Sequence, residues 1–202
     1  MSEVSSSPVL LVDDEASIRD LLSIHLENAG FQAIHAEDGI DAIVKLRSIF
    51  PKVIISDLNM PRMSGFEFIG IVRRRFPTIP IIALTGSFPS EFAVETEPDY
   101  WFEKSIQQFP DLVQVVRDLA QKAPDPSVLP QVDTTPVRIR PGFAGYFMLT
   151  CTDCQRTFKA THALGNKSAD GTADCAHCDA RVPYLIESPE AESHKPAVAA
   201  QE

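Results

Sequence analysis

Five polar side chains follow apolar runs of the sequence, each close to the point where a predicted strand ends: Asp13, Asp14, Asp57, Thr85 and Lys104. Apolar runs bounded in this way are typical of buried strands in a parallel sheet. Ligands of such sheets gather beyond the carboxyl ends of the strands. A carboxylate in the place of Asp57 could therefore bind a metal ion, act as a base or serve as a nucleophile.

The chemistry follows from bringing these groups together. Three carboxylates at one edge of a sheet repel one another, and a hard divalent cation such as Mg²⁺, which prefers oxygen ligands, relieves that repulsion. A hydroxyl from Thr85 and a positive charge from Lys104 complete what a transferring phosphoryl group needs. On this interpretation Asp57 is the nucleophile and forms an acyl phosphate. Taken singly, each aspartate could instead cap a helix, and the lysine could be a surface charge.

A second set of reactive side chains lies near the carboxyl end of the sequence. Cys151-Thr-Asp-Cys154 and Cys175-Ala-His-Cys178 are two Cys-x-x-Cys pairs, and their spacing predicts a tetrahedral Zn²⁺ site with each pair in the turn of a hairpin. A unit this small has little core, so the metal would supply much of its folding energy. Disulfides or a redox dithiol are the alternatives, but a reducing compartment and the missing thioredoxin-like pattern favour zinc. Four cysteines fill the coordination shell, so zinc catalysis is not expected.

Strands and helices alternate along the first part of the chain. Strands are predicted at 8–12, 31–36, 53–56, 80–84 and 100–103. Helices are predicted at about 16–29, 40–50, 64–76 and 110–122, and any helix within 88–98 is expected to be short. This alternation predicts an α/β domain with a doubly wound, five-stranded parallel sheet and helices on both faces.

The composition of the sequence changes after this domain. The predicted organisation is an α/β domain at 8–122, a proline-rich linker at 123–141, a small β module at 142–187 and a disordered tail at 188–202. Within the module, short strands are expected at 147–149 and 182–186.

Residues 8–122 resemble the receiver domain of two-component response regulators. The matching motifs are Val-Asp13-Asp14-Glu, Asp57-Leu-Asn-Met-Pro61-Arg-Met-Ser-Gly65, Leu-Thr85-Gly and Lys104. The resemblance implies a flavodoxin-like (CheY-like) fold in which Asp57 is the phosphoacceptor. It also implies that Asp14, Asp57 and the backbone carbonyl of Asn59 bind Mg²⁺ directly and that Asp13 binds it through water. The cysteine module resembles a zinc ribbon.

The same resemblance implies roles for residues around the phosphoacceptor. Thr85 would be the switch hydroxyl, Lys104 would pair with the phosphoryl group, and Asn59 and Ser87 would tune its lifetime. The switch aromatic would be Trp101, three residues before the lysine. The sequence departs from the family pattern at Ser105, where the family usually has proline.

Composition limits the partners. The chain has 202 residues, of which 44% are hydrophobic and 23% charged, as in globular proteins. A net charge of −10 argues against general affinity for nucleic acid or anionic membranes. There is no secretory signal and no apolar run long enough to span a bilayer, so a cytoplasmic location is expected.

The resulting hypothesis is a response regulator of a two-component phosphorelay. A sensor histidine kinase or phosphotransfer protein would phosphorylate Asp57 with Mg²⁺, and the change would be reported to a downstream protein. We expect no enzymatic activity beyond self-catalysed phosphotransfer and autodephosphorylation. Two alternatives are a transcription regulator that uses the zinc ribbon to bind nucleic acid and a degenerate receiver that serves as an interaction scaffold.

Overall fold

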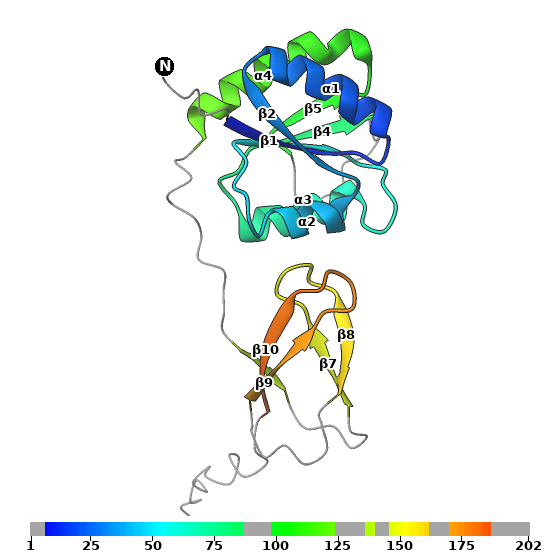
Figure 1. Ribbon diagram of the computed structural model, residues 1–202, viewed down its shortest axis with the longest axis vertical. Helices are drawn as coiled ribbons and strands as arrows, with labels where there is room; N and C mark the ends of the chain where they lie inside the picture. Colours follow the sequence, from blue (N-terminus) through cyan, green and yellow to red (C-terminus); the bar gives the residue numbers. More distant parts are fainter. Residues whose placement is uncertain (1–6, 87–97, 124–135, 140–145, 162–169, 187–202) are drawn as a thin grey trace, which may run out of the picture. The chain divides into compact units, whose positions relative to one another are not determined.

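The computed structural model describes residues 7–86, 98–123, 136–139, 146–161 and 170–186. The chain divides into two compact units, Met1–Gln131 and Val132–Glu202 (Figure 1). Each unit is described by itself.

The first unit is built on one parallel sheet. Its strands are β1 (Ser7–Val12), β2 (Phe31–Ala36), β3 (Val53–Asp57), β4 (Ile81–Thr85) and β5 (Tyr100–Glu103), in the order β2-β1-β3-β4-β5. The register pairs Val12 with Ser56 and Asp57 with Leu84, so the carboxyl ends of β1, β3 and β4 lie at the same edge. The predicted five-stranded parallel sheet is confirmed.

Helices cover both faces of this sheet. They are α1 (Ala16–Asn28), α2 (Gly39–Lys45), α3 (Gly65–Arg75) and α4 (Phe109–Lys122), with a short 3₁₀ turn, η1 (Ile106–Gln108), before the last. Helices α1 and α4 lie on one face and α2 and α3 on the other (Figure 1). This arrangement is the flanking-helix pattern that the sequence predicted. The expectation for 88–98 falls almost entirely outside the described residues.

Helix α2 is shorter than the sequence indicated. It ends at Lys45, whereas the apolar pattern continues to Phe50. The amides of Arg47 and Ser48 donate to the carbonyls of Val44 and Lys45, three residues earlier, at 3.3 and 3.0 Å, so the chain leaves the helix through tighter turns. An apolar pattern does not distinguish such turns from a regular helix.

Alternation along the central strands builds the core. Alternate residues of β1, β3 and β4 point to the face covered by α1 and α4, where they join one buried cluster: Val9, Leu11, Val53, Ile55, Ile82 and Leu84 from the strands, with Leu22, Leu26, Phe109, Leu112 and Val116 from the helices. Each large apolar side chain that is fully buried stabilises the fold by about 1.5–3 kcal/mol. The central strands are therefore a rigid support for the loops at their carboxyl ends.

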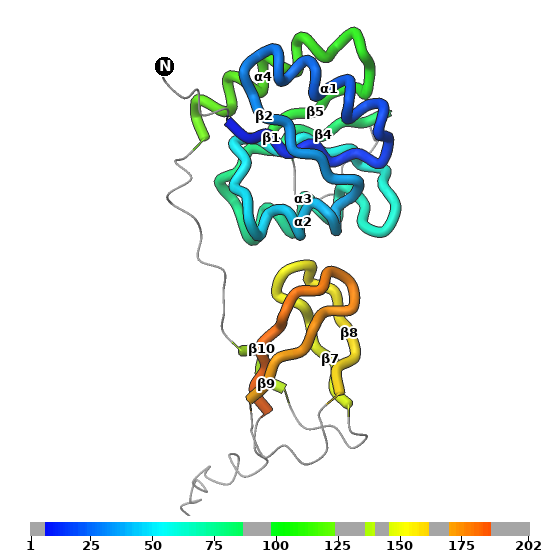
Figure 2. The backbone as a smooth tube through the Cα atoms, viewed as in Figure 1, coloured from blue at the N-terminus to red at the C-terminus, as the bar shows by residue number. Residues whose placement is uncertain are grey.

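The second unit contains two small sheets. Strands β7 (Tyr146–Thr150) and β8 (Thr157–Thr161) form an antiparallel hairpin. Strands β9 (Asp170–Asp174) and β10 (Arg181–Ile186) form another, and β6 (Val137–Ile139) joins it parallel to β10. The backbone path in Figure 2 shows the two hairpins with their turns close together. The inner faces meet where the Phe147 and Tyr184 rings lie 4.8 Å apart.

Strand β6 differs from the prediction for this part of the chain. Residues 137–139 belong to the expected linker at 123–141, yet they pair with β10. Ile139 lies in the core, but the four residues between Pro136 and Pro141 are too few for an alternating pattern to identify a strand. The rest of the linker from 124, apart from Pro136, and the expected tail at 188–202 lie outside the described residues.

Within the described ranges, every helix is too short or too polar to cross a membrane.

Candidate functional sites: an acidic pocket and a cysteine cluster

Three carboxylates meet at the carboxyl edge of the sheet. One carboxylate oxygen from each of Asp13, Asp14 and Asp57 lies within 4.8 Å of the others. Asp13 and Asp57 are buried, with 3% and 4% of their surface exposed, whereas Asp14 is exposed. They meet because β1 and β3 are adjacent in the sheet, so the residues that end these strands are neighbours. The structure thus brings together the aspartates that the sequence singled out.

The ammonium of Lys104 lies within this group. Its Nζ is 2.8 Å from Asp57 Oδ2, 3.2 Å from Asp13 Oδ1 and 2.8 Å from Glu15 Oε1. An ammonium has three protons to donate, and here three carboxylates accept them. Sequence reasoning did not single out Glu15, although an acidic residue directly after Asp14 was a visible signal.

The contacts of Lys104 change its own pKa and those of its carboxylate partners. Burial alone would lower the pKa of Lys104, but hydrogen bonds to Asp57, Glu15 and Asp13 outweigh it and raise the pKa above its ordinary value. Burial raises the pKa of Asp13, against the opposing effects of the Glu15 amide and Lys104. The hydrogen bond from Lys104 lowers the pKa of Glu15. Lys104 is therefore a persistent cation in the pocket.

The loop after β3 orients the Asp57 carboxylate. Its Oδ1 accepts hydrogen bonds from the amides of Leu58 (2.6 Å) and Asn59 (3.3 Å), while Oδ2 faces Lys104. The loop is held close to the start of α3, where the Gly65 amide donates to the Leu58 carbonyl at 3.0 Å. A Cβ on Gly65 would lie 2.1 Å from the Asp57 carbonyl oxygen, so only glycine fits there.

The other predicted residues lie on the neighbouring strands. Thr85 is 2% exposed and follows Leu84, the register partner of Asp57. Its carbonyl accepts from the Lys104 amide at 2.8 Å, which ties the end of β4 to the end of β5. Trp101 is half-buried on β5, opposite Ala83 in register, and Phe102 packs against the core cluster. Ser87 lies outside the described residues.

The donor atoms of this pocket suit a hard cation. All are carboxylate oxygens, one from each of three aspartates. Such a set fits Mg²⁺, which prefers oxygen ligands and keeps several waters. With Lys104 beside it, the pocket could neutralise a phosphoryl group next to a carboxylate nucleophile.

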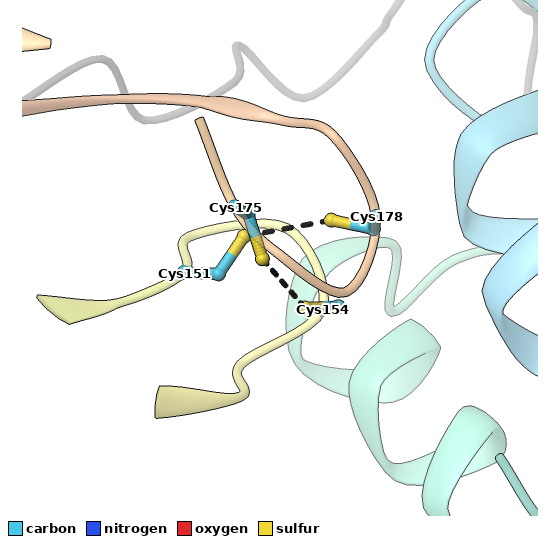
Figure 3. Close-up of side chains that lie close together, drawn as sticks. All are labelled: Cys151, Cys154, Cys175 and Cys178. Carbon is cyan, nitrogen blue, oxygen red and sulfur yellow. Dashed lines mark hydrogen bonds between the residues drawn. The ribbon is translucent and has the colours of Figure 1, made fainter. Parts of the chain in front are cut away.

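The second unit brings its four cysteine sulfurs together. The Sγ atoms of Cys151, Cys154, Cys175 and Cys178 all lie within 4.8 Å of one another, and all four residues are at most 2% exposed. Cys151 and Cys178 are 3.7 Å apart, as are Cys154 and Cys175 (Figure 3). The thiols are free rather than joined in disulfides. Four sulfurs at about 2.3 Å from a tetrahedral metal are about 3.8 Å apart, so the cluster has the size of a Zn²⁺ site.

The two cysteine turns have the same backbone geometry. Cys151 accepts from the Gln155 amide at 3.0 Å, and Cys175 accepts from the Asp179 amide at 2.9 Å, in both cases through the carbonyl. Gln155 and Asp179 both have left-handed backbones, with φ of 57° and 54°. His177 is exposed, and its Nε2 lies 3.4 Å from the Thr157 carbonyl oxygen of β8. His162, the other histidine of the module, lies outside the described residues.

Hydrogen bonds within the cluster shift the pKa values of two of its thiols in opposite directions. The Cys151 thiol, followed by that of Cys178, raises the pKa of Cys154. The pKa of Cys178 is lowered by hydrogen bonds with Cys151 and then Cys154. One thiolate is thus stabilised by its neighbours, but a fully ionised set needs a cation to offset the repulsion.

Comparison with known proteins identifies relatives that are similar in sequence and in fold. Residues 9–108 match the family model of the response regulator receiver domain. The chain is 40% identical over 88 residues to an uncharacterized 14.6 kDa protein of Leptolyngbya boryana, covering 43% of this chain and 67% of that protein. It is 37% identical over 101 residues to the phosphate regulon transcriptional regulatory protein PhoB of Escherichia coli (strain K12), covering 48% of this chain. That match spans only 44% of PhoB.

Two solved structures are similar to the first unit in fold and sequence. The chemotaxis protein CheY4 of Vibrio cholerae is 34% identical with a TM-score of 0.51, covering 57% of this chain and 99% of that one. The response regulator TrrA of Thermotoga maritima, crystallised in complex with Mg²⁺ and BeF, is 33% identical with a TM-score of 0.50. It covers 56% of this chain and 98% of that one.

Proposed function

The chain belongs to the response regulator receiver family through residues 9–108, and from this membership we propose that Asp57 accepts a phosphoryl group from a histidine kinase or phosphotransfer protein. The observation that carries the proposal is the meeting of Asp13, Asp14 and Asp57, with the Lys104 ammonium bound to Asp13 and Asp57. TrrA, whose structure contains Mg²⁺ and BeF, supports a similar ligand here.

In the proposed transfer, the Asp57 carboxylate attacks the phosphorus of a phosphohistidine. A P–O bond to Asp57 forms, the P–N bond breaks, and the ring nitrogen keeps the electron pair and takes up a proton. The amides of Leu58 and Asn59 hold the carboxylate in place for the attack. Mg²⁺ held by Asp13, Asp14, Asp57 and the Asn59 carbonyl would supply charge neutralisation for the phosphoryl oxygens.

After transfer, Lys104 exchanges a carboxylate partner for a phosphoryl oxygen. It already lies 2.8 Å from Asp57 Oδ2, so a short displacement is enough. Thr85, buried at the next strand end, would donate its hydroxyl to the phosphoryl group and change the β4 end accordingly. Trp101, on the adjacent strand, would follow this change and alter the surface that a downstream protein reads.

This function is tested by incubating the full chain with acetyl phosphate and Mg²⁺ and measuring intact mass. The expected result is a single phosphoryl adduct that needs Mg²⁺ and is lost in Asp57→Asn. No adduct, or an equal adduct in the variant, would overturn the proposal. Mg²⁺ titration also addresses the scaffold alternative, since a degenerate receiver need not bind the ion. No other enzymatic activity is proposed.

For the second unit, we propose a structural Zn²⁺ ion held by Cys151, Cys154, Cys175 and Cys178 in a zinc-ribbon-like module. The burial of the sulfurs and their 3.7 Å separations support it. Metal analysis of the purified chain should find about one zinc per molecule. Cys175→Ser should lose the metal and the cooperative melting of this unit, while Asp57→Asn should keep both. Full metal-free stability would contradict the proposal.

The charges of the second unit do not favour a nucleic-acid function. Its described charged residues are balanced, with Arg138, Arg156, Lys159 and Arg181 against Asp153, Asp170, Asp174 and Asp179. Four thiolates around Zn²⁺ would add a formal charge of about −2, which opposes phosphate contacts. We therefore propose that the output is a protein contact. We also propose a cytoplasmic location, because a reducing compartment keeps paired cysteines available as metal ligands.

A further inference from the structure

Arg62 has an unusual backbone in the loop that links β3 to α3. Its φ is 61°, in the left-handed region that is disfavoured for residues with a side chain. Such conformations persist where the surroundings hold them in place. The same loop carries Asp57 and Asn59, so whatever holds Arg62 also bears on the cation site.

The contact that holds Arg62 is a charge pair with the loop after β2. Its Nε forms an ion pair with Asp38 Oδ2, and its Nη2 donates to Glu37 Oε1 at 2.7 Å. Asp38 is completely buried, and its other oxygen, Oδ1, caps α2 by accepting from the amides of Ile40 and Asp41. A buried carboxylate without a charge partner is costly, so Asp38 favours the conformation that presents Arg62 to it.

Packing joins the same two loops. Met63, the next residue, is 1% exposed, and its Cγ and Sδ would lie 2.7 and 2.8 Å from a Cβ placed on Gly39. The Met63 side chain thus fills the space that a side chain at position 39 would need. Charge and packing therefore fix the β3–α3 loop against the turn formed by residues 36–39.

This turn also contacts the first acidic loop. The Asp13 amide donates to the Ala36 carbonyl at 3.1 Å, directly before Glu37 and Asp38. Residues 36–39 consequently contact the β1–α1 loop, which carries Asp13 and Asp14, and the β3–α3 loop, which carries Asp57 and Asn59. A rigid link between the two loops would fix the separation of their cation ligands.

We propose that Arg62, Asp38 and Glu37 form a clasp that positions the β3–α3 loop for cation binding. These are positioning residues, since they act through the loop and do not touch the ion. The inference rests on the proposed function, because it assumes that the acidic pocket binds Mg²⁺. Breaking the clasp should weaken Mg²⁺ binding while Asp13, Asp14 and Asp57 all remain.

The test is a double-mutant cycle on the full chain, with Mg²⁺ affinity measured by titration calorimetry. Asp38→Asn keeps an acceptor oxygen for the α2 cap and loses the charge, and Arg62→Gln loses the guanidinium without changing the backbone preference to that of glycine. Each should raise the Kd for Mg²⁺ about 5-fold or more, and the double variant should be no weaker than the singles. The matched control is Arg117→Gln, an exposed arginine on α4, which should bind within about 2-fold of the wild type.

Amide hydrogen exchange of the metal-free chain gives a second readout, which does not depend on the ion. Asn59 and Met63 should exchange faster in both single variants than in the wild type or in Arg117→Gln. Wild-type Mg²⁺ affinity and exchange in both singles, or losses that multiply in the double variant, would overturn the clasp while leaving the proposed function standing. A wild-type chain that binds no Mg²⁺ would overturn the proposed function itself. If Asp38→Asn fails to fold, Arg62→Gln alone decides by the same criteria.

Discussion

Lys104 Nζ lies 2.8 Å from Asp57 Oδ2, so a residue at the end of β5 donates directly to a residue at the end of β3, with β4 between them. The side chain reaches across the end of β4, where the Lys104 amide is already bound to the Thr85 carbonyl. Lys104 therefore connects the ends of β3, β4 and β5 through its ammonium and its amide, and loss of the ammonium should affect both stability and chemistry.

Removing the Lys104 charge should change how the free energy of unfolding of the metal-free protein depends on pH in the alkaline range. The folded-state pKa of Lys104 is raised, so its stabilising contribution is fully present below the ordinary lysine pKa of about 10.4 and is lost as pH rises through the raised folded value. Lys104→Met should lower the free energy of unfolding at pH 7 and flatten its decline above about pH 10. Urea unfolding across this range measures both. An unchanged alkaline slope in Lys104→Met would contradict the assignment.

Glu15 should act at the other end of the pH scale. Its folded-state pKa is lowered by Lys104, so its contribution is present above the ordinary glutamate pKa and is lost as pH falls through the folded value. Glu15→Gln should therefore make the metal-free protein less sensitive to acid below about pH 4.3. The effect should be small, because Glu15 is exposed at the surface. Asp118→Gln, on the exposed side of α4, is a control that should retain the wild-type acid slope.

A methyl group on Gly65 should disturb the loop between β3 and α3, which carries Asp57. The added Cβ would approach the Asp57 carbonyl oxygen to 2.1 Å and Leu58 Cα to 2.7 Å, both backbone atoms that cannot rotate away. Gly65→Ala should cost about 1–3 kcal/mol of stability and reduce phosphorylation by acetyl phosphate. Gly86→Ala, where a Cβ would meet nothing within 4 Å, is the matched control for stability. Equal melting temperatures of the two variants would refute the steric explanation.

Glycine at the strained positions of the cysteine turns should stabilise the second unit. Gln155 and Asp179 both have a left-handed φ, which costs a residue with a side chain about 1 kcal/mol relative to glycine. Asp179→Gly in the zinc-loaded chain should raise the melting temperature of this unit in calorimetry. Ala176→Gly, in the same turn but with an ordinary φ, should lower it or leave it unchanged. The opposite order of the two variants would show that the turn is held by other forces.

The sequence was sufficient to predict the acidic pocket because its residues lie directly at strand ends. Once β1 and β3 are adjacent, Asp13 and Asp57 must be neighbours, and no knowledge of side-chain conformation is needed. Glu15 and Arg62 could not be found in this way. Their contacts depend on the reach of long side chains and, for Arg62, on a left-handed backbone that the sequence does not indicate.

Two strands of the second unit, β8 and β9, were harder to predict because little of their sequence is apolar. The Cys-x-x-Cys pairs indicated the two turns, but β9 is the polar run Asp170–Asp174 and is stabilised by its pairing with β10. Its Gly171 accommodates the ring of Tyr184 from the opposite strand. Cross-strand contacts of this kind depend on register, which local pattern does not fix.

The position of Trp101 gives the protein an intrinsic optical probe. It is the only tryptophan in the chain, and it lies on the strand that ends at the pocket lysine. Selectively excited indole emission therefore originates in the first unit alone, whatever happens to the tyrosines of the second. Spectra recorded before and after addition of a phosphodonor would follow the proposed switch in unlabelled protein in real time.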